Sequence, residues 1–376
     1  MHNTIIERCT QLLTELRENK IEINYFLYRE GKDDEKISFD LNATKRFQLL
    51  KAMQYNPVQT DEPLLVELFK AEIERHKKNP FQGIFPALQL CAYLLSSYQK
   101  PEYVELFLKA KQANFDTYCG FDYKYLVSAG IVKTFEYIET KKPSYLEAFY
   151  HHVGNSISEC DISEQDFKEW KELLEDYYPS KLVIKNVEDE IDLAIELNET
   201  EILKEKIDEW EQSIQSWTQL NLKQLSNYKE TIDDTKGQIW ADEQLLEFLT
   251  TDWDKASGLQ LFSELLLKIN DIEKAWLRLK EIQIYVEQIP DWKIYGLGRA
   301  IIETYFDLVL SINNSHSQIA KEAFKWASKE VNDMEIHLNL VEKVMKAANL
   351  MGDTKISHKF KKIYESESQK LNDSLK

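Results

Sequence analysis

Three stretches of this chain repeat one pattern: a proline, a glutamate four residues later and a phenylalanine six residues later. The copies begin at Pro63, Pro101 and Pro143, which are 38 and 42 residues apart. A period of about 40 residues is typical of stacked helical arrays, because one helical unit cannot bury its apolar face without a neighbour. We therefore predict an all-α fold, an α-solenoid of antiparallel helix pairs.

Each copy also carries signals for the start of a helix. Proline suits the first helical turn, and the helix dipole favours a glutamate there. Tyr103 and Phe107 are four residues apart, as are Tyr145 and Phe149, so each pair lies on one helix face. A helix-start signal that arose more than once accounts for the Pro and Glu, whereas the recurring Phe favours a true repeat. A true repeat predicts equivalent buried sites for Phe69, Phe107 and Phe149.

The composition agrees with long helices joined by short turns. Hydrophobic residues make up 43% of the chain, which excludes a disordered protein. Only 10 of the 376 residues are Gly, against an average of about 7%. Scarce glycine leaves few turns with positive φ and few phosphate-binding loops.

The charge argues against direct nucleic-acid binding. The chain has 65 acidic and 47 basic residues, a net charge of −18, and only seven of the basic residues are Arg. Phosphate and guanine recognition relies heavily on arginine, so an acidic, arginine-poor chain is a poor candidate for it. The richness in Lys, Ile and Asn is typical of a low-GC microbial genome, and we expect a bacterial source.

The remaining bulk features predict a cytoplasmic protein without cofactors. Cys9, Cys91, Cys119 and Cys160 lie far apart without CxxC spacing, as expected for reduced, packed thiols. The first residues lack a basic region followed by an apolar run, so we expect no signal peptide. We also expect no membrane span, because no run approaches about 18 apolar residues.

Two sub-arrays are predicted, residues 1–179 and 180–376. All eight Trp residues follow residue 169, whereas seven of the eight Pro residues lie at or before Pro179. Residues 159–212 contain 19 Asp and Glu against 6 Lys, a net charge of −13. This acidic segment, with Glu188-Asp189-Glu190 at its centre, is interpreted either as a solubilising surface or as a docking site for a basic partner.

Residues 21–41 differ from the rest of the first sub-array. Two runs rich in branched and aromatic residues, 21–28 and 36–41, flank a Gly/Asp turn, which fits either a short β-hairpin or a helical extension. Apolar periodicity predicts helices elsewhere, near residues 4–18, 43–55, 62–78, 84–99, 101–113, 123–140, 143–153, 163–178, 187–198, 200–216, 218–232, 238–251, 256–289 (broken at Asn270), 291–312, 317–350 (broken near Asn332) and 353–372.

Residues 256–372 contain several copies of one helix–turn–helix pattern. A Gly or Asn followed by Asp separates two apolar segments at Asn270-Asp271 and at Gly352-Asp353, and small residues lie at Ala275 and Ala347-Ala348; Ile312-Asn313-Asn314, followed by Ala320 and Ala323, is a third example. These stretches resemble tetratricopeptide repeats. The resemblance implies a helical-repeat fold that binds a peptide or protein, without identifying the ligand.

Three local groups contain residue types that occur in metal, catalytic or nucleotide-binding sites. Glu147, His151 and His152 end one predicted helix, but a metal site needs a third convergent ligand, so we interpret them as a helix C-terminus. Cys119 lies in a segment that we predict to be a loop packing its Phe residues between repeats, without a nearby histidine as base. Gly296-Leu297-Gly298 lacks the third glycine of a nucleotide loop, and we expect its glycines to permit close helix approach.

The sequence therefore favours a non-catalytic protein- or peptide-binding adaptor or scaffold that uses the groove of the array. Solenoids present extended concave surfaces, and aromatic side chains serve there as anchors. The alternative functions are a microbial signalling or defence sensor that receives a regulatory peptide or small ligand, and a metal-dependent enzyme. The residues predicted to contact the partner are Gln89, Tyr93, Tyr125, Lys133, Tyr137, Tyr295 and Arg299.

Overall fold

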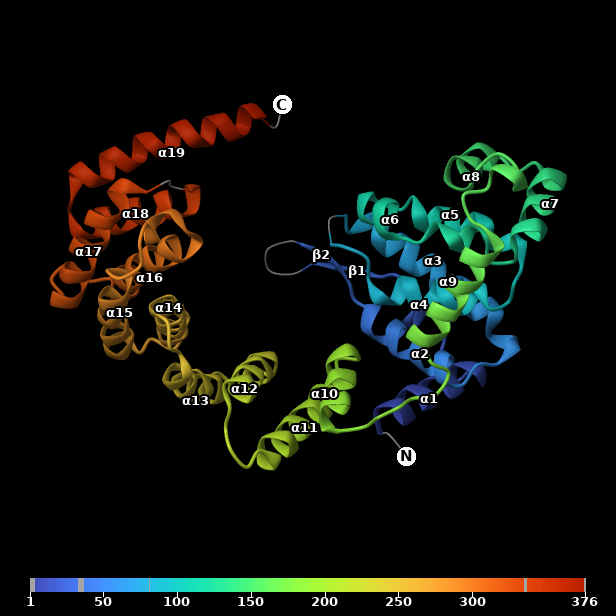
Figure 1. The fold of residues 1–376 in the computed structure, drawn as a ribbon, viewed down its shortest axis with the longest axis horizontal. Helices are drawn as coiled ribbons and strands as arrows, with labels where there is room; N and C mark the ends of the chain where they lie inside the picture. Colours follow the sequence, from blue (N-terminus) through green and yellow to red (C-terminus); the bar gives the residue numbers. More distant parts are fainter. Residues whose placement is uncertain (1–3, 33–36, 81, 335–336, 375–376) are drawn as a thin grey trace. The chain divides into compact units, whose positions relative to one another are not determined.

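The computed structural model describes residues 4–32, 37–80, 82–334 and 337–374, and it is all-α apart from one short hairpin. The chain forms two compact units, Met1–Glu209 and Trp210–Lys376 (Figure 1). The second unit therefore begins later than the predicted boundary after Pro179. Residues 180–209 belong to the first unit because α2 binds them: Lys51 pairs with Glu196 at 2.8 Å, and Gln48 donates to the carbonyl of Leu197 at 2.9 Å.

Most helices of the first unit agree closely with the periodicity of the sequence. The helix predicted at residues 123–140 is instead a 3-10 helix over Tyr123–Val127 and an α-helix that begins at Ile131, because Gly130 between them has a positive φ of 108°. Helices α2 and α3 have the predicted bounds. The α-helices of this unit, with the last one crossing into the second unit, are α1 Thr4–Arg17, α2 Ala43–Tyr55, α3 Glu62–Lys78, α4 Pro86–Ser96, α5 Val104–Lys111, α6 Phe115–Gly120, α7 Ile131–Lys141, α8 Leu146–Val153, α9 Glu164–Tyr177, α10 Val187–Glu196 and α11 Thr200–Ser213. Short 3-10 helices precede or link them: η1 Ile23–Tyr25, η2 Gln59–Asp61, η3 Pro101–Tyr103, η4 Tyr123–Val127 and η5 Ile157–Glu159.

The second unit consists of helix pairs. Its elements are α12 Gln219–Thr231, α13 Thr235–Leu245, η6 Leu246–Phe248, α14 Asp252–Lys268, α15 Ile272–Val286, η7 Trp292–Ile294, α16 Gly296–Ile312, α17 Gln318–Glu330, η8 Val331–Asp333, α18 Leu338–Met351 and α19 Thr354–Ser374. Successive helices pack as α12 with α13, α14 with α15, α16 with α17, and α18 with α19. The short turns within these pairs make their helices antiparallel. The all-α solenoid prediction is confirmed.

Four of the turns that join two α-helices directly share one hydrogen-bonded geometry. In each, a residue with positive φ ends one helix, and the next residue donates its N–H to the carbonyl five positions earlier, as in the Schellman motif. The positive-φ residues are Asn198 (53°), Asp233 (56°), Asn270 (60°) and Gly352 (75°). In the last three turns an Asp follows and caps the next helix; Asp271, for example, accepts from the N–H of Lys274 at 3.2 Å.

The three Pro-containing stretches begin helical segments, and their phenylalanines are buried. Pro63 is in the first turn of α3, Pro101 opens η3 ahead of α5, and Pro143 lies in the turn before α8. The Phe side chains have exposed fractions of 0%, 1% and 0% in chain order, for Phe69, Phe107 and Phe149. The ring centroids of the first two are 5.7 Å apart, whereas the third packs on Phe135 at 5.4 Å. These residues form the core between the helices.

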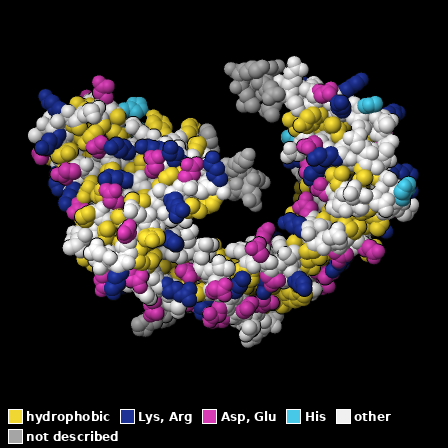
Figure 2. Space-filling model, turned by 180° about the vertical axis from the view of Figure 1, so that it is seen from behind, with side chains coloured by type: hydrophobic (Ala, Val, Ile, Leu, Met, Phe, Trp, Pro, Cys, Tyr) yellow, Lys and Arg dark blue, Asp and Glu magenta, His cyan; other side chains and the backbone are white. Residues whose placement is uncertain are grey.

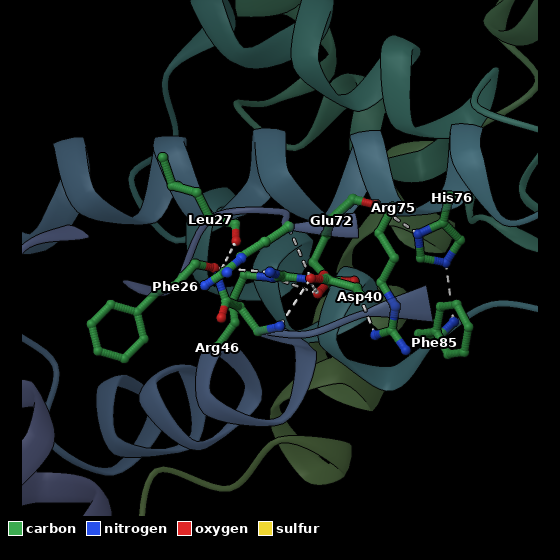
Figure 3. A network of polar contacts seen from close by, with 10 residues as sticks. Phe26, Leu27, Asp40, Arg46, Glu72, Arg75, His76 and Phe85 are labelled. Carbon is green, nitrogen blue, oxygen red and sulfur yellow. Dashed lines mark hydrogen bonds and ion pairs between the residues drawn. The ribbon is translucent and has the colours of Figure 1, made fainter. Parts of the chain in front are cut away.

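The hairpin prediction for residues 21–41 is confirmed, but its strands are shifted. Strand β1 (Glu30–Lys32) pairs antiparallel with β2 (Ser38–Asp40), with Gly31 opposite Phe39. The first strand lies where the turn was predicted, and η1 lies within the run predicted as a strand; residues 33–36 of that turn lie outside the described residues. The buried guanidinium of Arg46 in α2 fixes the hairpin, because it binds Asp40 and the carbonyl of Phe26 (Figure 3).

Residues 114–122, predicted to be a loop, contain the short helix α6. The Asn114 side chain accepts from the N–H of Thr117 at 2.9 Å, and the Thr117 hydroxyl accepts from the N–H of Asn114 at 2.9 Å, which forms a capping box. Cys119 is exposed on this helix. Phe121 is buried as predicted, whereas Phe115 is 69% exposed. The expectation that this segment packs all its Phe residues is therefore wrong for Phe115.

Candidate functional site

An exposed aromatic pair lies at the starts of α14 and α16. The rings of Trp253 and Tyr295 meet edge to face with centroids 5.3 Å apart, yet the two residues remain 39% and 47% exposed. Tyr295 is the N-cap residue of α16, and its side chain caps nothing. Ser, Thr, Asp or Asn at an N-cap contributes about 1 kcal/mol that a tyrosine does not supply. An exposed tyrosine at this position breaks a local stability rule, as functional residues often do.

The tight turn that precedes Tyr295 requires a glycine at position 298. A Cβ atom on Gly298 would lie 2.3 Å from the carbonyl oxygen of Trp292 and 2.9 Å from the Cα of Lys293. Only glycine lets η7 fold this tightly against the first turn of α16. The prediction that these glycines permit a close approach thus holds for Gly298, with a 3-10 turn as the neighbour, whereas Gly296 has open space around it.

Arg299 follows one turn after Tyr295 and begins a row of alternating charges. Its Nε lies 3.9 Å from Glu303, and Lys343 of α18 lies 3.7 Å from Glu303 and 2.7 Å from Asp307. Burial alone would lower the pKa of Lys343, but the bond to Asp307 and the neighbouring carboxylates together raise it. These partly exposed pairs contribute little to stability, about 0–1 kcal/mol each. They orient polar groups along α16 and α18.

Helix α14 extends the same surface. Leu261 and Glu264 follow Trp253 by eight and eleven residues, close to two and three helical turns, so the three share one face. Leu261 is 60% exposed. Glu264 accepts from the hydroxyl of Thr304 in α16 at 3.3 Å. We define the α14–α16 face as Trp253, Leu261, Glu264, Tyr295 and Arg299.

A cleft of about 470 Å³ adjoins this face between α12, α13 and α14. Asp242 lies in it beside the Ser226 hydroxyl; burial and the charge of Glu230 raise its pKa, although the bond to Ser226 opposes the shift. Leucines provide the apolar lining, and charged residues surround it. The lining residues are Lys223, Ser226, Asn227, Glu230, Gln238, Asp242, Leu245, Leu246, Leu249, Gly258, Leu261, Glu264, Leu265 and Lys268.

The predicted contact residues of the first sub-array do not form one open surface. Tyr125 is 4% exposed, because Trp170 of α9 packs edge to face on it at 5.0 Å, so its predicted role as a surface contact needs correction. Tyr93 is half-buried and stacks on Tyr178 at 4.7 Å. Trp170 of helix α9 covers Tyr125, and Tyr178, the C-cap residue of α9, covers Tyr93. The helix lies over α4 in the view of Figure 1. A helix from later in the chain occupies the site predicted for a partner.

The other predicted contacts are scattered. Gln89 and Tyr137 are half-buried. Lys133 is exposed, and its Nζ donates to the carbonyl of Gln99 at 2.7 Å. Of the predicted contacts, the structure leaves Tyr295 and Arg299 together on an exposed surface, whereas Tyr93 and Tyr125 lie together beneath Trp170 and Tyr178. It adds Trp253 to the exposed pair, which sequence reasoning missed. A large aromatic residue in the first turn of α14, among acidic residues, was the available signal.

The histidines of α8 contact α6. The hydroxyl oxygen of Tyr118 and Nε2 of His151 are 3.2 Å apart, and the ring centroids of Tyr118 and His152 are 5.7 Å apart. Burial lowers the pKa of His152, and the charges of Lys111 and His151 lower it further. Among the described residues, no group of three His, Cys, Asp or Glu side chains could hold a metal ion. Among the same residues, no helix is long and apolar enough to cross a membrane.

Part of the acidic segment is neutralised by other residues of the first unit. Glu196 pairs with Lys51 at 2.8 Å, and Glu199 pairs with Arg8 at 3.0 Å. On the side of the molecule seen in Figure 2, acidic and basic side chains alternate over both units. The acidic segment is therefore compatible with both interpretations, a solubilising surface and a docking site for a basic partner.

Comparison with known proteins gives no family for the chain. No protein-family model matches the sequence, and neither a curated protein nor a solved structure shows significant similarity to it. Functional inference therefore depends on the geometry described above.

Proposed function

We propose that this chain is a non-catalytic adaptor or scaffold that binds a protein or peptide segment on the α14–α16 face. The observation that carries the proposal is the exposed Trp253–Tyr295 pair with Arg299 one turn away. Trp, Tyr and Arg are the residue types most enriched among binding hot spots. The resemblance of the sequence of residues 256–372 to tetratricopeptide repeats would imply the same role.

The geometry also indicates the kind of segment that would bind. Exposed rings offer apolar contact area at a low entropic cost, because a Trp or Tyr side chain has few rotatable bonds. Arg299, Glu303 and Lys343 alternate in charge, so they would pair with a polar segment carrying both signs. We therefore expect an extended peptide with an apolar anchor for the aromatic pair and charged residues on either side.

Site-specific photo-crosslinking in the native host tests this proposal. A photoreactive phenylalanine analogue at Tyr295 should capture one specific protein, and the same analogue at Leu277, which is 59% exposed on α15, should not. Adding Trp253→Ala should reduce the capture at least about tenfold, the effect of losing about 1.4 kcal/mol of binding energy. Equal capture from both positions would mean that the α14–α16 face has no specific partner.

A receptor for a small ligand or regulatory peptide is the second candidate, and the cleft favours it. Its volume of about 470 Å³ is within the range of small-molecule sites, about 300–1,000 Å³. Asn227→Arg would place a charge at this cleft from an exposed position on α12, outside the α14–α16 face. For a receptor, this variant should lose ligand-induced thermal stabilisation; for an adaptor, its crosslinking through Tyr295 should persist.

A further inference from the structure

Helix α9 is bound to the first unit almost entirely through apolar side chains. Phe167, Trp170 and Tyr178 have exposed fractions of 7%, 5% and 8%, and half-buried Leu174 lies between the last two. Phe167, Trp170 and Leu174 are three and four positions apart and form a single stripe along α9, which the C-cap residue Tyr178 extends four positions further on. Among the described residues, every hydrogen bond and ion pair made by α9 side chains joins residues of α9 or its N-cap.

The helical conformation of α9 has its own local signals. Ser163 accepts from the N–H of Asp166 at 3.1 Å, and Asp166 accepts from the N–H of Ser163 at 3.1 Å, so a capping box starts the helix. Gln165 donates to Glu169 one turn on at 2.6 Å. Residues 178–186, which follow α9, have no regular structure. The start of the helix is therefore specified by its own residues, and the irregular segment on its C-terminal side contacts α2, where Gln54 donates to the carbonyl of Pro179 at 3.0 Å.

The surface beneath α9 consists of aromatic side chains. Tyr93 of α4 stacks on Tyr178 at 4.7 Å, and Tyr125 contacts Trp170 at 5.0 Å. Nε1 of Trp170 is buried without a hydrogen-bond acceptor, and such an unsatisfied donor costs about 1–3 kcal/mol. On the outer side of α9, Leu173 and Tyr177 are 68% and 71% exposed. These features resemble a ligand helix in a groove more than a helix within a core.

We propose that the surface formed by Tyr93 and Tyr125 is a second binding site, which α9 occupies as an internal ligand. The partner would be an amphipathic helix of another protein, with bulky apolar residues at the spacing of Phe167, Trp170, Leu174 and Tyr178. Docking of such a stripe into an apolar groove is a common mode of peptide recognition. Because α9 competes for the surface, the partner binds only when it displaces α9. This site is separate from the α14–α16 face and does not depend on the function proposed for that face.

Hydrogen exchange of the full-length protein tests whether α9 opens independently. Amides of residues 164–177 should exchange at least about tenfold faster than those of α4 and α7, because local opening exposes α9 alone. Exchange of all three helices at one common slow rate would overturn the proposal, since α9 would then open only with the whole unit.

A labelled peptide of residues 162–180 tests the site directly. It should bind a full-length Phe167→Ala/Trp170→Ala variant at least about tenfold more tightly than wild type, because the weakened α9 no longer competes. The control Leu173→Ala alters an exposed residue and should behave as wild type. A peptide with Trp170→Ala should lose at least about tenfold in affinity for the double variant.

Two further results would overturn the proposal. One is a double variant that keeps the exchange protection of α3 and α4 yet fails to bind the peptide. The other is concentration-dependent dimerisation of the wild type, with the peptide as a competitor, which would assign the site to α9 of a second copy. If the double variant unfolds, the exchange rates of the wild-type protein still decide whether α9 opens alone.

Discussion

Replacing Arg46 by Met should destabilise the first unit by about 3–5 kcal/mol, because it leaves the buried Asp40 without a counter-charge and leaves the buried Glu72 with only Arg75, 3.7 Å away. Arg46 is 0% exposed, and its guanidinium lies 2.5 Å from Asp40, 2.6 Å from Glu72 and 2.8 Å from the carbonyl of Phe26 (Figure 3). One side chain thus joins the hairpin, α2 and α3. Methionine has a similar length and is apolar, so the variant removes the charge with little change in packing.

Matched variants separate the charge from the geometry. Arg46→Lys keeps the charge but loses the planar fork that reaches three acceptors, and it should cost about 1.5–3 kcal/mol. Adding Asp40→Asn and Glu72→Gln to Arg46→Met should restore part of the loss, because the unpaired charge of Asp40 and the charge of Glu72, which only Arg75 then offsets, are both removed. Arg8→Met removes a 55% exposed side chain from its ion pair with Glu199, and it should cost under about 1 kcal/mol.

Native-state hydrogen exchange of α2 and α3 measures these free energies within the first unit, and urea unfolding followed by circular dichroism supplies the global value. A loss of less than about 1 kcal/mol for Arg46→Met would refute the reasoning, as would a neutralised triple variant no more stable than the single one. Either result would mean that water or protonation satisfies the two carboxylates at low cost and that packing holds the hairpin.

Three further predictions concern the stability of the protein and its dependence on pH. Nδ1 of His76 donates to the carbonyl of Glu72, and Nε2 accepts from the N–H of Phe85 at 3.1 Å, so the ring is neutral. Burial lowers the pKa of His76 below 6.5, although the bond to the carbonyl opposes the shift. Stability should therefore fall as the pH drops below about 6.5 towards the folded-state pKa, by up to about 1.4 kcal/mol per pH unit, and urea titrations of His76→Gln should lack this component. Gly298→Ala should cost about 1–3 kcal/mol, because its Cβ would overlap the carbonyl of Trp292; a calorimetric melt unchanged from wild type would contradict this. Phe149→Ala should cost about 3–5 kcal/mol from the cavity that it leaves, measured by urea unfolding, and a loss under about 1 kcal/mol would place the ring outside the core.

Local signals in the sequence determined most of the helices. The bounds of α2 and α3 follow from apolar periodicity and, for α3, from Pro63 in its first turn. The same holds for the turns at Asn270-Asp271 and Gly352-Asp353, where a positive-φ residue and a capping Asp are adjacent in the chain. Helix α6 was missed although its capping box was readable, because six residues give too short a period to recognise.

Only the tertiary structure decided which helix faces are covered. The sequence could not show that Trp170 lies on Tyr125, because the two are 45 residues apart and each is equally suited to a surface or a core. It could not show that Trp253 meets Tyr295, nor that Arg46 is buried between Asp40 and Glu72. The hairpin was anticipated, but its register depends on that buried network. Helix formation depends on neighbours within about four residues, whereas burial depends on contacts between distant segments, so the sequence determined the helices and the tertiary structure determined the candidate sites.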